Sequence, residues 1–381
     1  MDVLTKATLV FALLPIFSGR DVAISAPTEM SSDNRLPVAY PSPLLAQAIV
    51  PTNDMTQVIP SDQGIIEISG GAPAAGNLFH SFERFSLTPE QTANFLTTPF
   101  TDRVIGQVIG GTASSINGLL QVTGSPADLY LINPAGLLFG PNARLALGGS
   151  FTATTATHIG DGNQWFDVLS NPDYSTLTTA PSHFGFGNAG AIVNQGQLTV
   201  SDGQSLRLLG NHITNTGTLR SAAGEVTLVA VNQGQTIRLG QSGGLLNLEI
   251  IADAGFSEPL PALITGGNLS HSSELVVRHD GTVALDGSNS STQEQPFDIN
   301  NSGNISAQGA VGGQITLLGD RIQVLNSTLQ ASGINGGGSI RIGGDRQGRG
   351  PRASQTVVTD TASLVADATD QGNGGQVIVW S

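Results

Sequence analysis

Six histidines are the first side chains to consider for metal chemistry, because an imidazole nitrogen is a frequent ligand of zinc and other transition metals. They are His80, His158, His183, His212, His271 and His279. None of them forms an H-x-x-x-H or H-E-x-x-H pattern, and the chain contains no cysteine. The sequence therefore predicts neither a zinc hydrolase site nor a thiolate metal site.

One stretch has the form of a hydrolase nucleophile elbow. Residues 240–244 read Gly-Gln-Ser-Gly-Gly and match G-x-S-x-G. That motif exposes its serine on a strand-to-helix turn, whereas the segment that follows here, Gly-Leu-Leu-Asn-Leu-Glu-Ile-Ile, is typical of a strand. The chain contains 49 glycines, so a match to this pattern is expected by chance. We therefore predict no catalytic serine.

Paired carboxylates could cleave a polysaccharide if they faced each other about 5 to 9.5 Å apart across a groove. The candidates by residue type alone are Asp253, Asp280, Asp286, Asp320 and Asp345. Aspartate is also common in solvated turns. We predict no catalytic, cofactor-binding or metal site, and a carbohydrate-active enzyme is the alternative.

Composition narrows the classes of protein and partner. The chain has 381 residues, of which only 12% are charged, a composition that argues against a charge-rich helical bundle. The net charge of -14 at pH 7 disfavours nucleic acid and anionic membranes as partners. The absence of cysteine suits a chain that stays unfolded while it crosses membranes.

The N-terminus indicates export. Lys6 precedes an apolar run over residues 7–17, which has the length of a signal peptide and is too short to span a bilayer as a helix. Cleavage after Ala23-Ile24-Ser25 or after Ala46-Gln47-Ala48 would fit the small-residue pattern. We expect a signal peptide, leader and linker over residues 1–48, with a buried N-terminal helix as the alternative.

From Ile49 onward, short runs of alternating apolar residues predict an all-β chain. Runs such as GIIEIS, RVIGQVIGG, INGLLQVTG and ADLYLIN each end at Gly, Asn, Asp or Pro, and turn signals recur about every ten residues. These runs have the length of strands.

Two repeated patterns indicate a solenoid. Asn-x-Gly-x-aliphatic begins at Asn194, Asn215 and Asn301, with intervals of 21 and 86 residues, the second close to four times the first. Gly followed by alternating aliphatic residues begins at Gly224, Gly313, Gly338 and Gly375. We predict a parallel β-helix with coils of about 20 to 25 residues, in which stacked asparagines bond from coil to coil. A β-sandwich or propeller is the alternative, although hairpin dipeptides do not recur regularly.

Residues 243–297 interrupt the repeat, and we expect them to be loops or insertions outside the coil stack. The sequence stops at Ser381 within an apparent strand, without a polar capping turn. We therefore expect repeats that either continue or are truncated, including a degenerate fragment of a larger protein as one possibility.

A turn lies inside one of the most apolar windows, Leu129 to Phe151. In Asn133-Pro134-Ala135-Gly136, proline presets φ at the first central position and glycine removes the steric cost at the exit. We expect Asn133 to cap this turn and the flanking strands to close an end of the β-helix.

An ordered set of motifs resembles a known family. Asn-Leu-Phe-His-Ser-Phe occupies residues 77–82, Ser-Ser-Ile-x-Gly-Leu-Leu-Gln-Val occupies 114–122, and Asn-Pro-x-Gly occupies 133–136. Over about residues 49–165, this order resembles the N-terminal secretion domain of filamentous-haemagglutinin-like exoproteins of two-partner secretion, in the form found in cyanobacteria.

The resemblance assigns two groups of site residues. The family's Asn-Pro-Asn-Gly-Ile motif falls on Asn133, Pro134, Ala135, Gly136 and Leu137, while its Asn-Pro-Asn-Leu motif has no counterpart between Phe85 and Arg103. The secondary motif is Asn77, Leu78, Phe79, His80, Ser81 and Phe82, in which we expect His80 to be structural. The turn either serves folding only or is also read by a transporter, which could bind the extended strands by β-augmentation.

The resemblance also implies a function. The exoprotein would reach the periplasm by the Sec route, be recognised unfolded by periplasmic domains of an outer-membrane β-barrel transporter, and fold outside as a right-handed parallel β-helix. It would need no cofactor and would display an adhesin surface for a host-cell or surface glycan or protein. The expected domains are the leader to 48, a capping secretion domain over 49–165, a linker over 166–187 and β-helix repeats over 188–381.

Overall fold

The computed structural model describes residues 49–162, 164–170, 173–187, 189–240, 248–252, 274–277, 283–286, 298–348 and 350–381. The chain divides into two units, residues 1–45 and residues 46–381, and every described residue lies in the second. The predicted signal peptide, leader and linker over 1–48 lie outside the described residues.

Three long sheets of mainly parallel strands build the described unit, and we name them sheets A, B and C. In spatial order, sheet A contains β1 (Ile49–Pro51), β5 (Asn77–Phe85), β7 (Arg103–Val108), β10 (Asp128–Ile132), β13 (Phe151–Thr154), β19 (Ser205–Gly210), β22 (Glu225–Ala230), β29 (Gln314–Leu318), β32 (Ser339–Ile342) and β35 (Gln376–Val379), with β4 (Ala72–Ala74) paired to β5. Sheet B contains β2 (Thr56–Pro60), β3 (Ile65–Gly70), β6 (Thr92–Leu96), β9 (Leu119–Thr123), β12 (Arg144–Ala146), β18 (Gln197–Val200), β21 (Thr218–Ser221), β28 (Asn304–Ser306), β31 (Thr328–Gln330) and β34 (Ser363–Val365). Sheet C contains β8 (Ser114–Ile116), β11 (Leu137–Phe139), β17 (Ala191–Asn194), β20 (His212–Asn215), β27 (Ile299–Asn301), β30 (Arg321–Val324) and β33 (Gln355–Val358).

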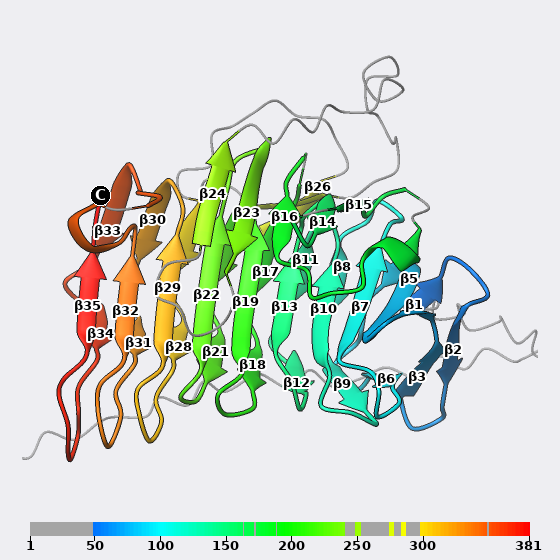
Figure 1. Ribbon diagram of the computed structural model, residues 1–381, viewed down its shortest axis with the longest axis horizontal. Helices are drawn as coiled ribbons and strands as arrows, with labels where there is room; N and C mark the ends of the chain where they lie inside the picture. The colour runs from blue at the N-terminus through cyan, green and yellow to red at the C-terminus, as the bar shows by residue number, and fades with distance from the viewer. Residues whose placement is uncertain are drawn as a thin grey trace, which may run out of the picture. The chain divides into compact units, whose positions relative to one another are not determined.

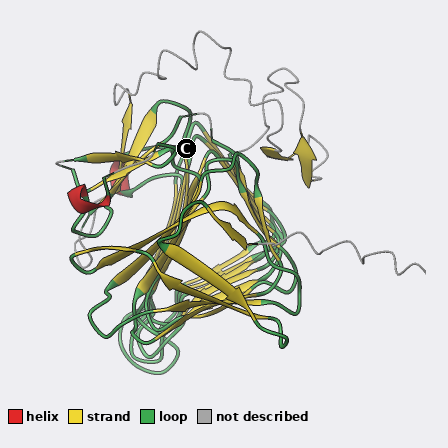
Figure 2. Ribbon diagram, turned by 90° about the vertical axis from the view of Figure 1, so that its right-hand side faces the viewer, coloured by secondary structure: helices red, strands yellow, loops and turns green. Residues whose placement is uncertain are grey.

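A complete coil contributes one strand to each sheet. The chain passes from β10 in sheet A to β11 in sheet C and β12 in sheet B, and then returns in β13, which pairs in parallel with β10. Figure 1 shows the strands succeeding one another along the stack, and Figure 2 looks along it. The predicted parallel β-helix is confirmed.

Antiparallel strands terminate the stack at its N-terminal end. In sheet A, β1 and β4 both run antiparallel to β5, and in sheet B β2 runs antiparallel to β3. The remaining pairings within sheets A, B and C are parallel, as in β5 with β7. This arrangement covers the first parallel strands with a hairpin and a reversed strand, in agreement with the predicted cap.

The inner core follows from alternation along each strand. In β18, Leu198 and Val200 are buried between the sheets, while Gln197 and Thr199 face solvent. The same inward position is held by Leu219 in β21 and Ile305 in β28, which pair in register. Repeated coil after coil, this stacking forms one continuous hydrophobic core.

A second core lies on the outer face of sheet A, and the sequence did not predict it. An antiparallel sheet, sheet D, covers that face and supplies Ile159, Phe166, Phe184 and Ile237 to the contact. Its strands, in spatial order, are β15 (Trp165–Asp167), β14 (His158–Gly160), β16 (His183–Gly185), β23 (Gln235–Leu239) and β24 (Leu248–Ala252). Strand β10 is buried on both faces for this reason, which explains its consecutive apolar residues, Leu-Tyr-Leu-Ile.

The expected linker over residues 166–187 is wrong. The segment instead contains part of β15, the 3₁₀ turn η1 (Tyr174–Thr176) and β16. Five of its apolar side chains, among them Phe166 and Phe186, are at most 3% exposed within the outer core. A segment that buries this much apolar surface is an integral part of the fold.

Asparagines form the predicted ladder between coils. Asn194 donates from Nδ2 to Oδ1 of Asn215 at 2.8 Å, and Asn215 donates to Oδ1 of Asn301 at 2.7 Å. Asn301 in turn donates to Ser327 Oγ at 3.1 Å. All three asparagines are fully buried, so these amide bonds satisfy polar groups that water cannot reach.

Glycines allow the coils to approach closely at the same corner. A Cβ built on Gly217 would lie 2.2 Å from the carbonyl oxygen of Gly196, and one on Gly303 would lie 2.1 Å from that of Gly217. The second repeat behaves alike, since a Cβ on Gly338 would lie 2.0 Å from Gly313 O. Both sequence patterns therefore mark positions where backbone meets backbone.

The 86-residue interval between Asn215 and Asn301 spans a single coil. The reading of this interval as close to four coil steps of 21 residues is wrong. Asn215 pairs directly with Asn301, and Val229 pairs with Leu318 in the adjacent sheet. The chain leaves the stack after Ala230, forms β23 and β24 of sheet D and the hairpin of β25 (Glu274–Val277) and β26 (Val283–Asp286), and returns at β27. Within the expected interruption at residues 243–297, only the three strands β24, β25 and β26 are described, and the rest of it lies outside the described residues.

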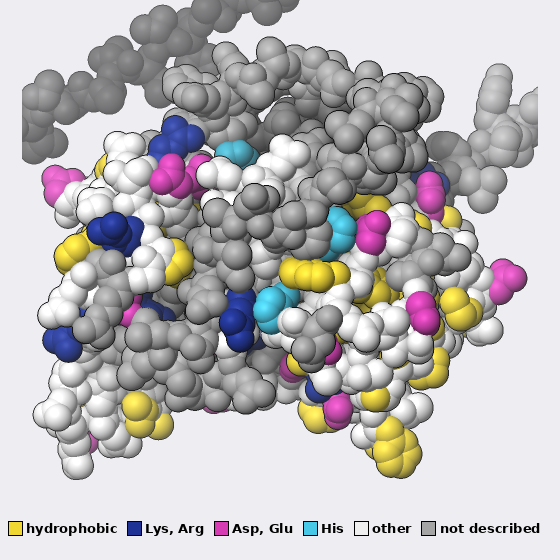
Figure 3. Space-filling model, turned by 45° about the horizontal axis from the view of Figure 1, so that its top comes forward, with side chains coloured by type: hydrophobic (Ala, Val, Ile, Leu, Met, Phe, Trp, Pro, Cys, Tyr) yellow, Lys and Arg dark blue, Asp and Glu magenta, His cyan; other side chains and the backbone are white. Residues whose placement is uncertain are grey.

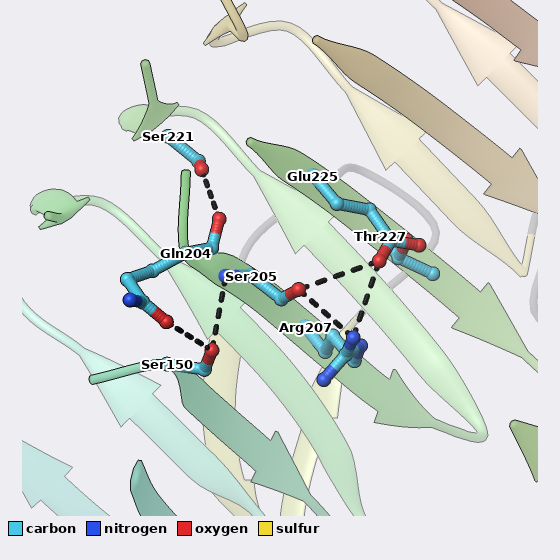
Figure 4. A network of polar contacts seen from close by, with 7 residues as sticks. All are labelled: Ser150, Gln204, Ser205, Arg207, Ser221, Glu225 and Thr227. Atoms are coloured by element: carbon cyan, nitrogen blue, oxygen red, sulfur yellow. Dashed lines mark hydrogen bonds and ion pairs between the residues drawn. The ribbon is translucent and has the colours of Figure 1, made fainter. Parts of the chain in front are cut away.

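Polar side chains also join coils outside the core (Figure 4). Arg207 on β19 donates from Nη2 to Ser205 Oγ at 2.9 Å and lies 3.2 Å from Glu225 Oε2 on β22. Ser150 Oγ donates to Gln204 Oε1 at 3.0 Å and so ties in the preceding coil. Because Arg207 and Glu225 are both part-exposed, the ion pair itself contributes little stability.

Helical structure is minor in the described part of the chain. Besides η1 it consists of the 3₁₀ turn η2 (Arg346–Gly348). Among the described residues, no helix has the length and apolar character required to cross a membrane.

Candidate functional site

The turn at Asn133 has the predicted geometry. Gly136 N donates to Asn133 O at 3.0 Å, which closes a β-turn with Pro134 at its first central position. Asn133 Oδ1 accepts from Ala135 N at 3.0 Å, so the side chain caps the turn as expected. Gly136 adopts φ +122°, a backbone conformation that favours glycine.

Neighbouring coils hold this turn on both sides. Asn133 Nδ2 donates to Thr112 O and to Ser114 Oγ, each at 2.9 Å, in the preceding coil. On the other side, Gly190 N donates to Pro134 O at 2.7 Å, and a Cβ on Gly190 would lie 2.3 Å from Ala135 O. The motif is thus enclosed within the stack.

The expectation that the strands beside the turn close an end of the β-helix is wrong. β10, before the turn, lies between β7 and β13, and β11, after it, lies between β8 and β17. The inward side chains of these two strands, Leu129, Leu131, Leu137 and Phe139, all belong to the inner core and are fully buried. The turn therefore occupies an interior coil, because further coils follow it in all three sheets.

The secondary motif lies on β5 and uses both faces of that strand. On the outer side, Asn77 Nδ2 donates to Leu177 O at 2.8 Å and to Thr179 O at 2.9 Å, which ties the η1 segment to sheet A. Phe79 packs against Phe166 and Tyr174, with ring centroids 5.5 and 4.9 Å away. Ser81 accepts a hydrogen bond from Gln107 Nε2 at 3.2 Å. Leu78 alternates with these residues, so it lies on the opposite face of β5, where it is half-buried.

The inner side of β5 carries His80 and Phe82, both fully buried. The His80 ring lies 6.3 Å from the Phe82 ring and 5.6 Å from the Phe95 ring, and its Nδ1 is 3.3 Å from Thr56 Oγ1. Burial lowers the pKa of His80 from 6.5 to about 4. This surrounding of aromatic rings agrees with the structural role expected for His80.

We expect mild acid to destabilise the fold through His80. Because the folded-state pKa of His80 lies below the unfolded value, the unfolded chain binds more protons between pH 6.5 and about 4. The stabilisation is complete above pH 6.5 and is lost as the pH falls toward 4, with about 2 kcal/mol lost between pH 7.5 and pH 5.

Urea unfolding at these two pH values measures the effect. The variant His80→Phe should show a smaller loss than the natural protein. Part of the loss remains, since burial also lowers the pKa of His212. An equal loss in both proteins would show that His80 is not responsible.

The two motifs are not in contact, although both lie along sheet A. Strand β7 separates β5 from β10 and pairs with each of them. Asn133 and Asn77 are at most 1% exposed. In the folded protein, these two side chains are therefore hidden from an external partner.

The residues considered for catalysis do not form a described site. Residues 241–244 of the G-x-S-x-G match, together with Asp253 and Asp280, lie outside the described residues, and the side chain of Asp286 is not described. Asp320 is exposed, and Asp345 lies 3.8 Å from Arg341 in an ion pair. Among the described residues, no group of three or more His, Cys, Asp or Glu is arranged to hold a metal ion.

The partners of the secondary motif were missed from the sequence. Asn77 and Phe79 contact residues of the segment assigned as a linker, namely Phe166, Tyr174, Leu177 and Thr179. A signal was available, because Phe166 and Val168, and again Phe184 and Phe186, alternate with polar or small residues as in a half-buried strand.

Comparison with known proteins identifies the family. The family of the TPS secretion domain, where TPS denotes two-partner secretion, matches residues 46–258, more than half of the chain. The chain belongs to the TPS secretion domain family. The cyanobacterial subtype stays a prediction.

Two solved secretion domains are similar to this chain. One is the crystal structure of the HMW1 secretion domain from Haemophilus influenzae, with 18% identity, a TM-score of 0.49, and coverage of 87% of this chain and 93% of that chain. The other is the crystal structure of the filamentous hemagglutinin secretion domain, with 13% identity, a TM-score of 0.45, and coverage of 87% and 99%. None of the curated proteins matches the chain.

Membership in the family gives the chain its function. It is a secreted exoprotein whose TPS secretion domain directs export through the periplasm to the cell surface or the environment. TPS secretion domains work with a cognate outer-membrane transporter. The predictions of a secretion domain and of this route are confirmed.

Proposed function

We propose that the two motifs form part of the signal that the transporter reads before the chain folds. The observation that carries this proposal is their burial, since Asn133 and His80 are fully buried and Asn77 is 1% exposed. A partner can reach such side chains only in an extended, unfolded chain. The flanking apolar strands could then pair with an edge of the transporter's periplasmic domains by β-augmentation.

A matched pair of variants separates recognition from folding. Asn133→Ala removes the hydrogen bonds that the motif makes to Thr112 and Ser114 in the preceding coil. Asn215→Ala removes two buried hydrogen bonds in the asparagine ladder, outside the motif. Both variants should destabilise the folded protein. If the motif is read, Asn133→Ala should lower secretion by about tenfold, while Asn215→Ala should lower it much less.

The measurement uses the full chain in cells with and without the cognate transporter and scores the protein in the culture medium. Wild-type secretion should depend on the transporter. An equal fall in secretion for the two variants would assign the motif to folding only. Secretion that persists without the transporter would remove the proposal altogether.

We further propose that the exposed surface of the coils acts as a non-enzymatic adhesin, with a glycan or protein as its partner. Because the family match extends over residues 46–258, past the boundary expected at residue 165, we place this display surface on the later coils, from β27 to β35. Two of the carboxylates considered for catalysis are described. Asp345 forms an ion pair with Arg341, and Asp320 is exposed in a turn between strands. A rigid solenoid with solvated strand faces also suits display, because its regular coils offer a long, continuous surface.

A further inference from the structure

Three loops project from the later coils of the stack. They join β28 to β29, β31 to β32 and β34 to β35, and Figure 1 shows them side by side at its lower left. Isolated parallel bridges from Gly309 to Gly333 and from Gly333 to Ala368 hold them in register. Figure 3 shows mostly backbone and uncharged polar side chains, in white, at this end. The three stacked loops form an ordered ridge, which we call the loop ridge.

Two of the three Asn-Gly pairs in the sequence lie on the loop ridge. Asn335-Gly336 is in its second loop and Asn373-Gly374 in its third, whereas Asn117-Gly118 lies between β8 and β9. An asparagine followed by glycine is prone to deamidation, because glycine has no Cβ to obstruct its backbone nitrogen. That nitrogen can then attack the side-chain Cγ of the asparagine before it.

Both pairs on the ridge have the freedom that this attack requires. Asn335 and Asn373 are exposed, and within the described part of the chain their side-chain amides have no hydrogen-bond partner. A Cβ built on Gly374 would meet no atom within 4 Å, and one on Gly336 would meet only Asn373 O, at 3.9 Å. Because no contact holds the amides, each side chain can rotate until its Cγ comes within reach of the nitrogen.

The third pair is locked in a coil. Asn117 Oδ1 accepts from Asn142 N at 2.9 Å and from Asn142 Nδ2 at 3.3 Å, so its amide is held in place. A Cβ built on Gly118 would lie 2.2 Å from the carbonyl oxygen of Gln91, which shows how closely this glycine meets the preceding coil. The same dipeptide therefore occurs once in a rigid setting and twice in an open one.

We propose that Asn335 and Asn373 deamidate spontaneously in the folded protein. The glycine nitrogen bonds to Cγ, the bond from Cγ to Nδ2 breaks, and ammonia leaves with the proton of the glycine nitrogen, which gives a succinimide ring. Water then adds to either ring carbonyl and opens the ring, so the product is aspartate or isoaspartate. Lys6 is the only lysine of the chain, so no lysine amine of the described residues competes with water.

Each conversion changes the charge and the backbone of the loop ridge. It adds a negative charge to loops that already carry Asp367 and Asp370, both exposed. Isoaspartate also routes the main chain through Cβ and so lengthens it by one atom. Gly337 N donates to Asn373 O at 3.0 Å, and this lengthening would displace the acceptor. Deamidation at Asn373 should therefore loosen the contact between the second and third loops.

Peptide mass spectrometry of the full-length protein tests the proposal. Folded and guanidinium-unfolded samples are kept at mildly alkaline pH, and the replacement of a side-chain NH₂ by OH is followed over time. Cleavage after arginine places the three pairs in separate peptides, which begin after Arg103, Arg321 and Arg352. The unfolded sample gives the intrinsic rate of each pair, so the ratio of folded to unfolded rates isolates the effect of the structure.

We expect Asn335 and Asn373 to keep their unfolded rates to within about threefold, and Asn117 to react about tenfold or more slowly than in the unfolded chain. Gly374→Ala is the matched variant, because its Cβ meets no neighbouring atom and obstructs only the attacking nitrogen. It should slow Asn373 by about tenfold or more and leave Asn335 unchanged.

Three results would overturn the proposal. The first is protection of Asn335 and Asn373 in the folded protein to the same degree as Asn117. The second is an Asn117 that reacts as fast folded as unfolded, since the structure would then not select the sites. The third is an unchanged rate at Asn373 in Gly374→Ala, which would exclude attack by the glycine nitrogen. None of these measurements depends on the transporter or on an adhesin partner.

Discussion

Replacing Gly217 with alanine is expected to lower the free energy of unfolding by about 3 kcal/mol or more. The added Cβ would lie 2.2 Å from the carbonyl oxygen of Gly196 in the preceding coil. That carbonyl cannot turn away, because it accepts the backbone hydrogen bond of Thr218 at 2.8 Å. The coils would have to separate at this corner, and the adjoining amide ladder would stretch with them.

Gly374→Ala is the matched control for this prediction. A Cβ on Gly374 meets no heavy atom within 4 Å, and its φ lies outside the left-handed region. We expect urea unfolding to show a clear loss of stability for Gly217→Ala and almost none for Gly374→Ala. Similar midpoints for Gly217→Ala and the natural protein would show that the coils tolerate wider spacing.

Asn215→Ala is expected to cost about 3 to 5 kcal/mol. Asn215 accepts from Asn194 at 2.8 Å and donates to Asn301 at 2.7 Å, and all three side chains are fully buried. The change leaves a donor on one neighbour and an acceptor on the other without these bonds, where water cannot replace them. Each such loss costs about 1 to 3 kcal/mol.

Asn304→Ala provides the comparison for the ladder. Asn304 Oδ1 accepts from Thr328 N in the next coil at 3.2 Å, but this bond is exposed to solvent. Water can replace it, so we expect a loss below about 1 kcal/mol. Equal losses for Asn215→Ala and Asn304→Ala in urea unfolding would show that burial does not strengthen the ladder.

The sequence predicted those features of the fold that repeat. Asn194, Asn215 and Asn301 recur because each coil needs the same buried amide, and Gly313 and Gly338 recur because each coil approaches the last through backbone alone. A requirement that returns with every coil leaves a periodic trace. A periodic pattern of this kind can be recognised from the sequence alone.

Features that occur once in the stack were not predicted correctly. Sheet D is built from strands far apart in the sequence, such as β14 and β23, and no period connects them. Its cover on sheet A makes Tyr130 and Ile132 buried rather than exposed. The number of coils between Asn215 and Asn301 was predicted wrongly for the same reason. Only the pairing of these two residues in the structure shows that they are one coil apart.

The candidate site was predicted in its local chemistry and missed in its surroundings. Asn133 caps its turn and Gly136 adopts positive φ, as residue types alone indicate. Asn77 instead bonds to carbonyls 100 and 102 residues away. Contacts of that separation follow from the fold as a whole, and a local pattern does not encode them.

The chain's departure from the stack after Ala230 has a consequence for engineering. Where the chain rejoins the stack, Asp298 O accepts a hydrogen bond from Ile213 N at 2.8 Å. The coils before and after the departure therefore pair directly with each other. The entropy lost in closing a loop grows only with the logarithm of its length. The position between Ala252 and Asp298 is therefore a natural graft point, where a guest epitope could replace the resident segment and be carried out of the cell while β23 and β24 keep their places in sheet D.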